Sequence, residues 1–288
     1  MLSPDARTVA LDLLRAPPGY GLDLAVLTSY TLDLETLLAL PLGVLAQSDQ
    51  GLEQLLEDPL LLLEALREAG DRVHVFVDEA GVAPPGKQRE IYAMLESSIH
   101  PVRAPHGGAF HPKVWLARFT RKGAEPRLRV AVLSRNLTFD RSWDIALSSE
   151  AIPTSEKPCE QSRPLCSLLR ALPALCESVR HPLDSDLTGS VLGLAEQVEA
   201  CSFPSPADFE GPIGFHALGL DPSATSPWCP RSDGSRLLAI APFVNASGLQ
   251  ALQQMSRKPW MLVSRQEELD KLPADTLASW DPVRVLAD

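Results

Sequence analysis

Two short stretches of the chain combine residue types that handle phosphate. His111 and Lys113 flank a proline in an extended segment, and residues two apart on a strand project from the same face. An imidazole that attacks or moves protons, beside a fixed ammonium charge, suits a phosphate ester. Ser134 and Asn136 have the same spacing at the end of the next predicted strand and add a hydroxyl and an amide as donors. The sequence therefore predicts one anionic site made of these four residues.

A basic island surrounds these residues. Between Pro101 and Trp143 the chain has nine basic and two acidic residues, a net charge of +7, whereas the whole chain has −11, so the remainder carries −18. Such an island indicates a local anionic ligand, although a solvated basic hairpin over residues 118–129 is an open alternative. The candidates for substrate binding are Arg118, Arg121, Lys122, Arg135 and Arg141, and Asp144 is a candidate to orient His111 or to pair with Arg135.

The cysteines give no metal signature. They are five in number, unevenly spaced, without a C-x-x-C pair and without histidine at zinc-finger distance: Cys159, Cys166, Cys176, Cys201 and Cys229. We expect no metal and no cofactor, and we interpret the thiols as small apolar groups in a reducing compartment.

The chain also lacks the patterns of a membrane protein. Its longest apolar run, Leu37–Ala46, is about half of the roughly 20 residues that span a bilayer, and the segment from Met1 to Asp5 lacks the basic and apolar regions of a signal peptide. We therefore expect a cytoplasmic protein that does not bind membranes.

Strands and helices alternate in the predicted secondary structure, which indicates an α/β fold with a largely parallel sheet. Asp78 and Glu79, at the end of the second strand, are candidates to orient a site histidine. The predicted strands are 22–30, 72–78, 113–120, 128–134 and 143–148, the third and fourth forming an antiparallel hairpin, and the predicted helices are 34–47, 52–69 and 87–100.

The pattern changes after residue 150. Residues 151–235 are rich in proline and contain helical stretches, so we interpret them as a connector or insertion. Residues 236–288 resume the alternation and resemble the beginning of the first segment, with strands at 237–244, 260–264 and 283–286 and helices at 247–257 and 266–272.

The residues His111, Lys113, Ser134 and Asn136 resemble the HxK and Ser-x-Asn elements of the phospholipase D-like superfamily. The stretch from Ser134 to Asp144, SRNLTFDRSWD, looks like its bacterial nuclease-like branch, and Leu27–Gly43 is also similar to these proteins. Two positions depart from the pattern: Arg118 stands near the position of the Asp of the full motif, and Leu133 replaces a glycine. The resemblance implies a mixed sheet flanked by helices, with a complete first lobe in 1–150 and a partial second lobe in 236–288.

The resemblance also implies a mechanism and a function. A motif histidine forms a covalent phosphohistidine without metal, a second motif histidine protonates the leaving oxygen, and Lys113 and Asn136 stabilise the phosphoryl oxygens. A nuclease acting on DNA or RNA, in bacterial restriction or defence, is the function it implies. The alternative is a non-catalytic subunit that binds nucleic acid or a helicase or ATPase partner. A lipid-cleaving enzyme is disfavoured, because no amphipathic membrane-facing segment is apparent.

The chain contains one HxK motif, and the mechanism needs two histidines. In the first lobe Val73 precedes His111 by 38 residues, and the same interval counted from Trp260 ends beyond Asp288. We therefore expect a second copy of the chain, a partner subunit or residues outside this polypeptide to complete the site. We favour a split or truncated two-lobe protein, inactive alone, over a homodimer.

Overall fold

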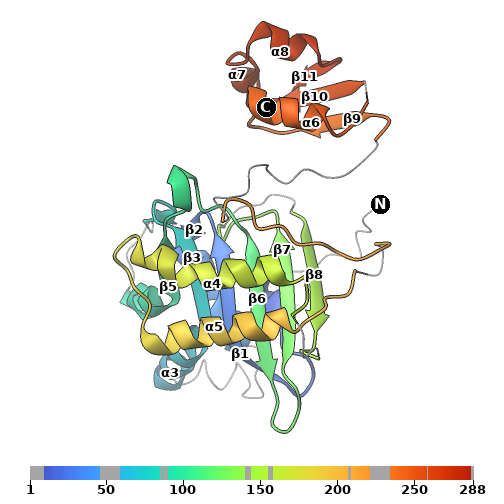
Figure 1. Ribbon diagram of the computed structural model, residues 1–288. Coiled ribbons are helices and arrows are strands. Elements are labelled where there is room, and N and C mark those ends of the chain that lie inside the picture. The colour runs from blue at the N-terminus through green and yellow to red at the C-terminus, as the bar shows by residue number, and fades with distance from the viewer. Residues whose placement is uncertain are drawn as a thin grey trace. The chain divides into compact units, whose positions relative to one another are not determined.

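The computed structural model describes residues 10–45, 59–84, 86, 90–139, 144–154, 158–206, 209–220, 234–257 and 259–286. The chain divides into two compact units, Met1–Pro222 and Ser223–Asp288, each with a sheet of its own (Figure 1). In the described part of the chain, no helix has both the length and the apolar character needed to cross a membrane.

The first unit is built on a mixed sheet in the order β5-β3-β1-β6-β7-β8. Its strands β1, β3 and β5 are parallel, and β6, β7 and β8 continue the sheet in antiparallel pairing. The bounds are β1 Gly21–Ser29, β3 Val73–Asp78, β5 Ile99–Val102, β6 Val114–Thr120, β7 Arg127–Leu133 and β8 Ala146–Ala151. A short parallel pair, β2 Leu32–Asp33 and β4 Val82–Ala83, follows the ends of β1 and β3.

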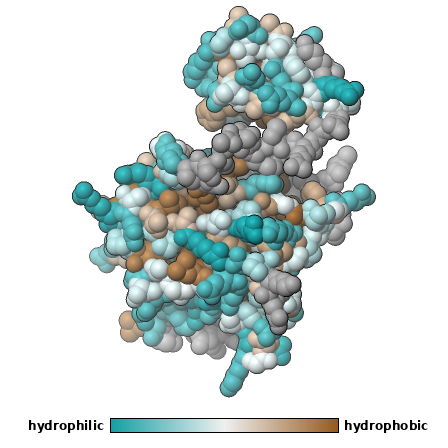
Figure 2. Space-filling view, in the orientation of Figure 1, coloured by the Kyte–Doolittle hydropathy of each residue, from teal (hydrophilic) through white to brown (hydrophobic). Residues whose placement is uncertain are grey.

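Helices cover both faces of this sheet because its strands present apolar side chains alternately to each side. On β6, Leu116 packs toward α4 (Arg163–Glu177) and α5 (Ser185–Glu199), which cross the sheet in Figure 1, whereas Trp115 and Phe119 face the opposite core. That core also holds η2 Ala10–Leu14, α1 Leu34–Leu45 and η3 Glu90–Ser98, and α3 Pro59–Gly70 lies beside α1. Figure 2 shows hydrophilic and hydrophobic residues interspersed over the α4 and α5 face.

The predicted mixed sheet flanked by helices is confirmed, with differences in detail. Of the helix predicted for 87–100, Glu90–Ser98 form a 3-10 helix, residues 87–89 lie outside the described residues, and Ile99–Val102 forms the edge strand β5. An edge position explains how a strand accommodates Pro101, which cannot donate to a neighbour. The strand predicted for 143–148 is β8, shifted to Ala146–Ala151. Three of the five strand pairings in the six-stranded sheet are antiparallel, so the prediction of a largely parallel sheet is wrong. Residues 46–58, part of the predicted leucine-rich helices, lie outside the described residues.

The first compact unit extends beyond the predicted boundary at residue 150. Helices α4 and α5 bury apolar residues such as Leu169 and Val191 in the same core as Val26 and Val130 of the sheet. Residues from the predicted connector therefore form one of the two layers that cover the sheet. The proline content of the region suggested a loop-rich insertion, but Pro164 stands in the first turn of α4, where its missing N–H has no intrahelical partner to lose.

The second unit contains a small parallel sheet in the order β11-β10-β9. Its elements are β9 Leu237–Ile240, α6 Ala246–Gln253, β10 Trp260–Ser264, α7 Gln266–Leu269, α8 Ala274–Ala278 and β11 Val283–Val285. Its core includes Ala239, Leu249, Leu262 and Trp280. The strand and helix order predicted for 236–288 is therefore present.

Candidate functional site

The predicted site residues lie at one end of the sheet of the first unit, where β6 begins and β1 and β7 end. His111 and Lys113 come directly before β6, and Ser134 and Asn136 directly after β7. Because β6 and β7 are antiparallel neighbours, the start of one lies beside the end of the other, and the Leu133 amide donates to the Lys113 carbonyl at 2.9 Å. The carboxyl end of β1 reaches the same edge of the sheet, since β1 pairs with β6.

His111 and Lys113 are in contact. The Lys113 Nζ lies 3.2 Å from Nδ1 and 3.4 Å from Nε2 of the imidazole, and it donates to the His111 carbonyl at 3.3 Å. Burial lowers the pKa of His111 first, and the Lys113 charge lowers it further. Burial also lowers the pKa of Lys113. Burial of His111 and the charge of Lys113 both favour a neutral imidazole, which is the form that acts as a nucleophile.

Asn136 joins this pair through Tyr30. The Tyr30 amide donates to Asn136 Oδ1 at 3.2 Å, and the Tyr30 ring lies 4.9 Å from the His111 ring, tilted by 43°. Because the side-chain oxygen accepts this bond, the Asn136 amide nitrogen is left to donate elsewhere, as a ligand to a phosphoryl oxygen requires. The structure thus brings His111, Lys113 and Asn136 into one neighbourhood.

Ser134 serves a different contact. Its hydroxyl donates to Asp144 Oδ1 at 2.8 Å and accepts from the Ile145 amide at 2.9 Å, which closes the connection between β7 and β8. Asp144 also pairs with Arg135 at 3.4 Å, and Arg135 donates to the Thr138 carbonyl at 2.7 Å. Of the two partners considered for Asp144, His111 and Arg135, the structure places it beside Arg135.

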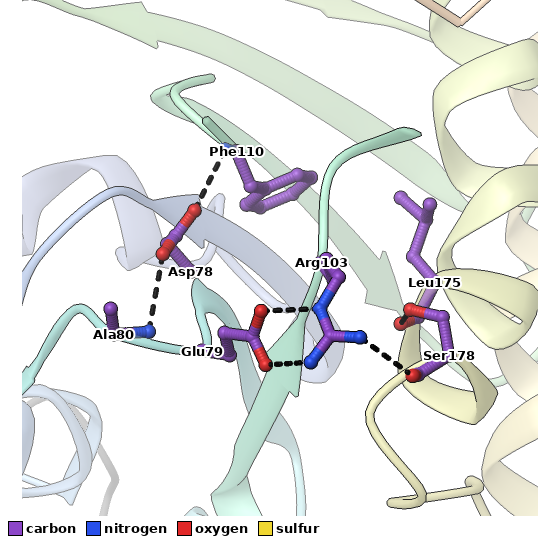
Figure 3. Close-up of polar contacts among 7 residues, drawn as sticks. All are labelled: Asp78, Glu79, Ala80, Arg103, Phe110, Leu175 and Ser178. Carbon is purple, nitrogen blue, oxygen red and sulfur yellow. Dashed lines mark hydrogen bonds and ion pairs between the residues drawn. The ribbon is translucent and has the colours of Figure 1, made fainter. Parts of the chain in front are cut away.

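Asp78 holds the segment that leads into the motif. Its buried carboxylate accepts from the Phe110 amide at 2.9 Å and from the Ala80 amide at 3.1 Å (Figure 3). The neighbouring Glu79 forms a two-point ion pair with Arg103, which lowers the pKa of that carboxyl group, and Arg103 reaches the Ser178 carbonyl after α4. Both acidic residues therefore fix backbone segments around the site.

The remaining predicted substrate ligands lie elsewhere. Arg118 pairs with Asp23 and donates to Gln197 of α5 at 3.2 Å. Arg121 and Lys122 belong to the turn between β6 and β7, which Figure 1 shows at the bottom of the hairpin. His111 lies before the other end of β6. The seven residues of β6 separate the two ends by roughly 20 Å. Arg141 lies outside the described residues.

Ion pairs account for much of the basic island. Four of its arginines contact acidic residues from outside the island: Arg103 with Glu79, Arg118 with Asp23, Arg129 with Glu150, and Arg135 with Asp144. Their charge is therefore balanced within the fold. Among the described residues, the charged side chain nearest the His111 ring is Lys113.

Sequence analysis missed the residues of β1 that reach the site. Thr28, Ser29 and Tyr30 each contact a segment that carries a site residue, and the only signal was that an apolar strand ends in polar residues. No group of three or more histidine, cysteine or acidic residues within the described ranges is arranged to hold a metal ion.

No family model and no curated protein matches this chain. Among solved structures, a variant of yeast tyrosyl-DNA phosphodiesterase is 14% identical, with a TM-score of 0.41, over 67% of this chain and 38% of that chain. Polyphosphate kinase from Porphyromonas gingivalis is 12% identical, with a TM-score of 0.36, over 96% of this chain and 37% of that one. The chain thus spans little more than a third of the length of either protein.

Proposed function

We propose that this chain supplies one half of the active site of a phospholipase D-like phosphodiesterase that acts on nucleic acid. The observation that carries the proposal is the contact of Lys113 Nζ with the His111 imidazole at 3.2 Å, with Asn136 held beside them through Tyr30. A neutral imidazole, a fixed ammonium and an amide donor are the groups that a metal-independent attack on a phosphodiester requires.

Each residue has a defined part in this reaction. An imidazole nitrogen of His111 forms a bond to phosphorus as the bond from phosphorus to the leaving oxygen breaks, and the leaving oxygen takes a proton from a second histidine. Lys113 and the Asn136 amide stabilise the charged phosphoryl oxygens. Water then attacks phosphorus, gives its proton to the second histidine, and releases His111.

The second histidine comes from another half-site, provided by a second copy of the chain or by a partner subunit. Residues 223–288 contain no histidine, so the second unit is not its source. The nucleic acid substrate, the nuclease-like branch and a role in restriction or defence are supported by the resemblance of residues 134–144 alone.

The test combines cleavage and binding. The purified chain is incubated with a fluorescent oligonucleotide in excess EDTA, with and without His111→Ala, and inorganic phosphate is titrated while the His111 ring is followed by NMR. Cleavage that persists in EDTA and is lost in His111→Ala supports the proposal. Activity that disappears in EDTA and returns with magnesium contradicts it.

Phosphate binding separates the remaining outcomes. Phosphate that shifts the His111 resonances without cleavage by the chain alone supports a half-site that needs completion, and adding a partner that carries a second HxK motif should then restore cleavage. If such an assembly binds nucleic acid but does not cleave it, the non-catalytic alternative holds. Absence of both cleavage and a phosphate effect at His111 overturns the proposal.

A further inference from the structure

Three consecutive residues at the end of β1 hold the two segments that carry the site. Thr28 and Ser29 are buried hydroxyl residues, with exposed fractions of 2% and 0%. Thr28 Oγ1 accepts from the Val114 amide at 2.8 Å and donates to the Val114 carbonyl at 3.1 Å, directly after Lys113. Ser29 Oγ accepts from the Leu137 amide at 3.0 Å, directly after Asn136.

Tyr30 contacts both segments at once. Its ring packs against the His111 ring, while its backbone amide fixes the side-chain oxygen of Asn136. These two residues lie 25 positions apart in the sequence, and Tyr30 is therefore a direct link between them. A ring contact of this kind restricts the rotation of the imidazole, which decides where its nitrogens point.

The turn between β3 and β4 packs closely against the backbone of Tyr30. A side-chain carbon at Gly81 would lie 1.8 Å from the Tyr30 carbonyl oxygen, so only glycine permits this approach. The Gly81 amide donates to the Asp78 carbonyl at 2.7 Å, and the Asp78 side chain holds Phe110. The ends of β1 and β3 therefore form one packed support beneath the site.

We infer that the segment Thr28-Ser29-Tyr30 is the positioning element of the site, with Tyr30 setting the relative placement of His111 and Asn136. This inference rests on the proposed function. None of the three residues is assigned a chemical step. They fix the distance between nucleophile and amide donor, and a misplacement of about 1 Å is enough to slow an enzyme roughly a hundredfold.

Two tyrosines at opposite ends of β1 provide a matched test. Tyr30→Ala removes the ring from His111, and Tyr30→Phe restores it. Tyr20→Ala is the control, because the Tyr20 ring lies at the distal end under Arg127. In the cleaving assembly we expect Tyr30→Ala to lower kcat by about 10- to 100-fold with KM changed less than about twofold, Tyr30→Phe to recover most of it, and Tyr20→Ala to leave kcat unchanged.

A second readout does not depend on turnover. NMR titration of the His111 ring should show its pKa rising toward the ordinary value in Tyr30→Ala, because the ring that helps to bury the imidazole is gone. Tyr30→Phe should keep the lowered pKa. Thr28→Val should weaken the effect of phosphate on the His111 resonances, and Thr28→Ser, which keeps the hydroxyl, should restore it.

The two proposals fail in different ways. If no assembly cleaves a phosphodiester and phosphate leaves His111 unaffected, while Tyr30→Ala still alters the His111 titration, the proposed function fails and the positioning contact stands. If cleavage or phosphate binding is present and Tyr30→Ala behaves like Tyr20→Ala in both readouts, the positioning role is wrong. Circular dichroism of each variant identifies one that has failed to fold. If Tyr30→Ala fails to fold, Thr28→Val supplies the measurement, and if Thr28→Val fails, Tyr30→Ala does.

Discussion

The six-stranded sheet of the first unit and the three-stranded sheet of the second unit begin alike and differ in what lies beside their first strand. In both, three parallel strands lie side by side in the order in which they follow along the chain: β1, β3 and β5 in one, and β9, β10 and β11 in the other. In the first unit the antiparallel strand β6 pairs with β1, and His111 and Lys113 lie directly before it. Among the described residues of the second unit, β9 pairs only with β10.

The side chains of the two first strands show the consequence. Leu24 and Val26 of β1 are 4% and 1% exposed beneath α4 and α5, whereas Leu238 and Ile240 of β9 are 54% and 63% exposed. The parallel half of the sheet is therefore a scaffold common to both units. The residues of the proposed site come with the antiparallel hairpin of the first unit, and α4 and α5 complete the core there.

The largest expected effect comes from removing the hairpin's imidazole. In the assembly that cleaves the diester, His111→Ala should lower kcat by at least about a thousandfold, because loss of a nucleophile removes the covalent route. Arg284→Ala on β11 of the second unit should leave cleavage unchanged. Oligonucleotide cleavage measured for both variants checks this contrast, and comparable losses in the two would place essential chemistry in the second unit as well.

A second contrast concerns an arginine in each sheet. Arg129 of β7 is paired with Glu150 of β8 and donates to the carbonyls of Asp12, Leu13 and Arg15, so it ties the N-terminal helix η2 to the sheet. Arg129→Ala leaves these partners unsatisfied and should lower the free energy of unfolding by about 2–4 kcal/mol.

The control for this prediction is again Arg284→Ala. Arg284 is exposed on β11 and donates to its neighbour's carbonyl, so its loss should cost less than about 0.5 kcal/mol. Denaturant unfolding of the full chain measures both. Equal effects would mean that the contacts of Arg129 contribute no more than those of an ordinary surface residue.

Local pattern was enough to predict much of the fold, and the unpredicted parts depend on tertiary contacts. The hairpin follows from the two-residue period of its strands. The predicted proximity of His111 and Lys113 is present, although both residues lie before β6 and not on it. The contact of Ser134 with Asp144 was not predictable, because a hydroxyl that ends a strand serves a turn as readily as a ligand. Nor was the balancing of Arg118 by Asp23, since the partners come from strands that are far apart in the sequence.

A pair of buried histidines should make the stability of the first unit sensitive to acid, whereas the second unit contains no histidine. His74 Nδ1 lies 3.1 Å from His100 Nε2 between β3 and β5, and His100 Nδ1 is buried without a partner in the described residues. Burial lowers the pKa of His74, and burial together with the charges of His74 and His181 lowers the pKa of His100 to about 3.

The unfolded chain therefore takes up these protons first as the pH falls. The free energy of unfolding therefore keeps its full value above about pH 6.5 and falls between about pH 6.5 and pH 3. Titration of His100 alone should lower it by about 2 kcal/mol at pH 5 relative to pH 7.5. Denaturant unfolding at the two pH values should show a smaller loss in His100→Gln than in the unmodified chain and in His216→Gln. An identical loss in all three would assign the acid sensitivity to other groups.

The smallest expected effect is the shift in the pKa of His111. It sharpens the contrast between the β6–β7 hairpin, which His111 precedes, and the sheet of the second unit, which has no histidine. Because burial is the first cause of its lowered pKa and the Lys113 charge the second, His111 should titrate below pH 6.5, and the acidic limb of kcat/KM should lie below that value too. Lys113→Gln removes the charge but not the burial, so it should raise the pKa of His111 without restoring its ordinary value, whereas Lys113→Arg should keep it low. NMR titration of the imidazole measures all three proteins. A His111 pKa at or above 6.5 in the unmodified chain would contradict the expected effects of burial and of Lys113. A pKa above about 7 would mean that the ring is mostly charged at neutral pH, and it would then be a phosphate-binding cation instead of the nucleophile.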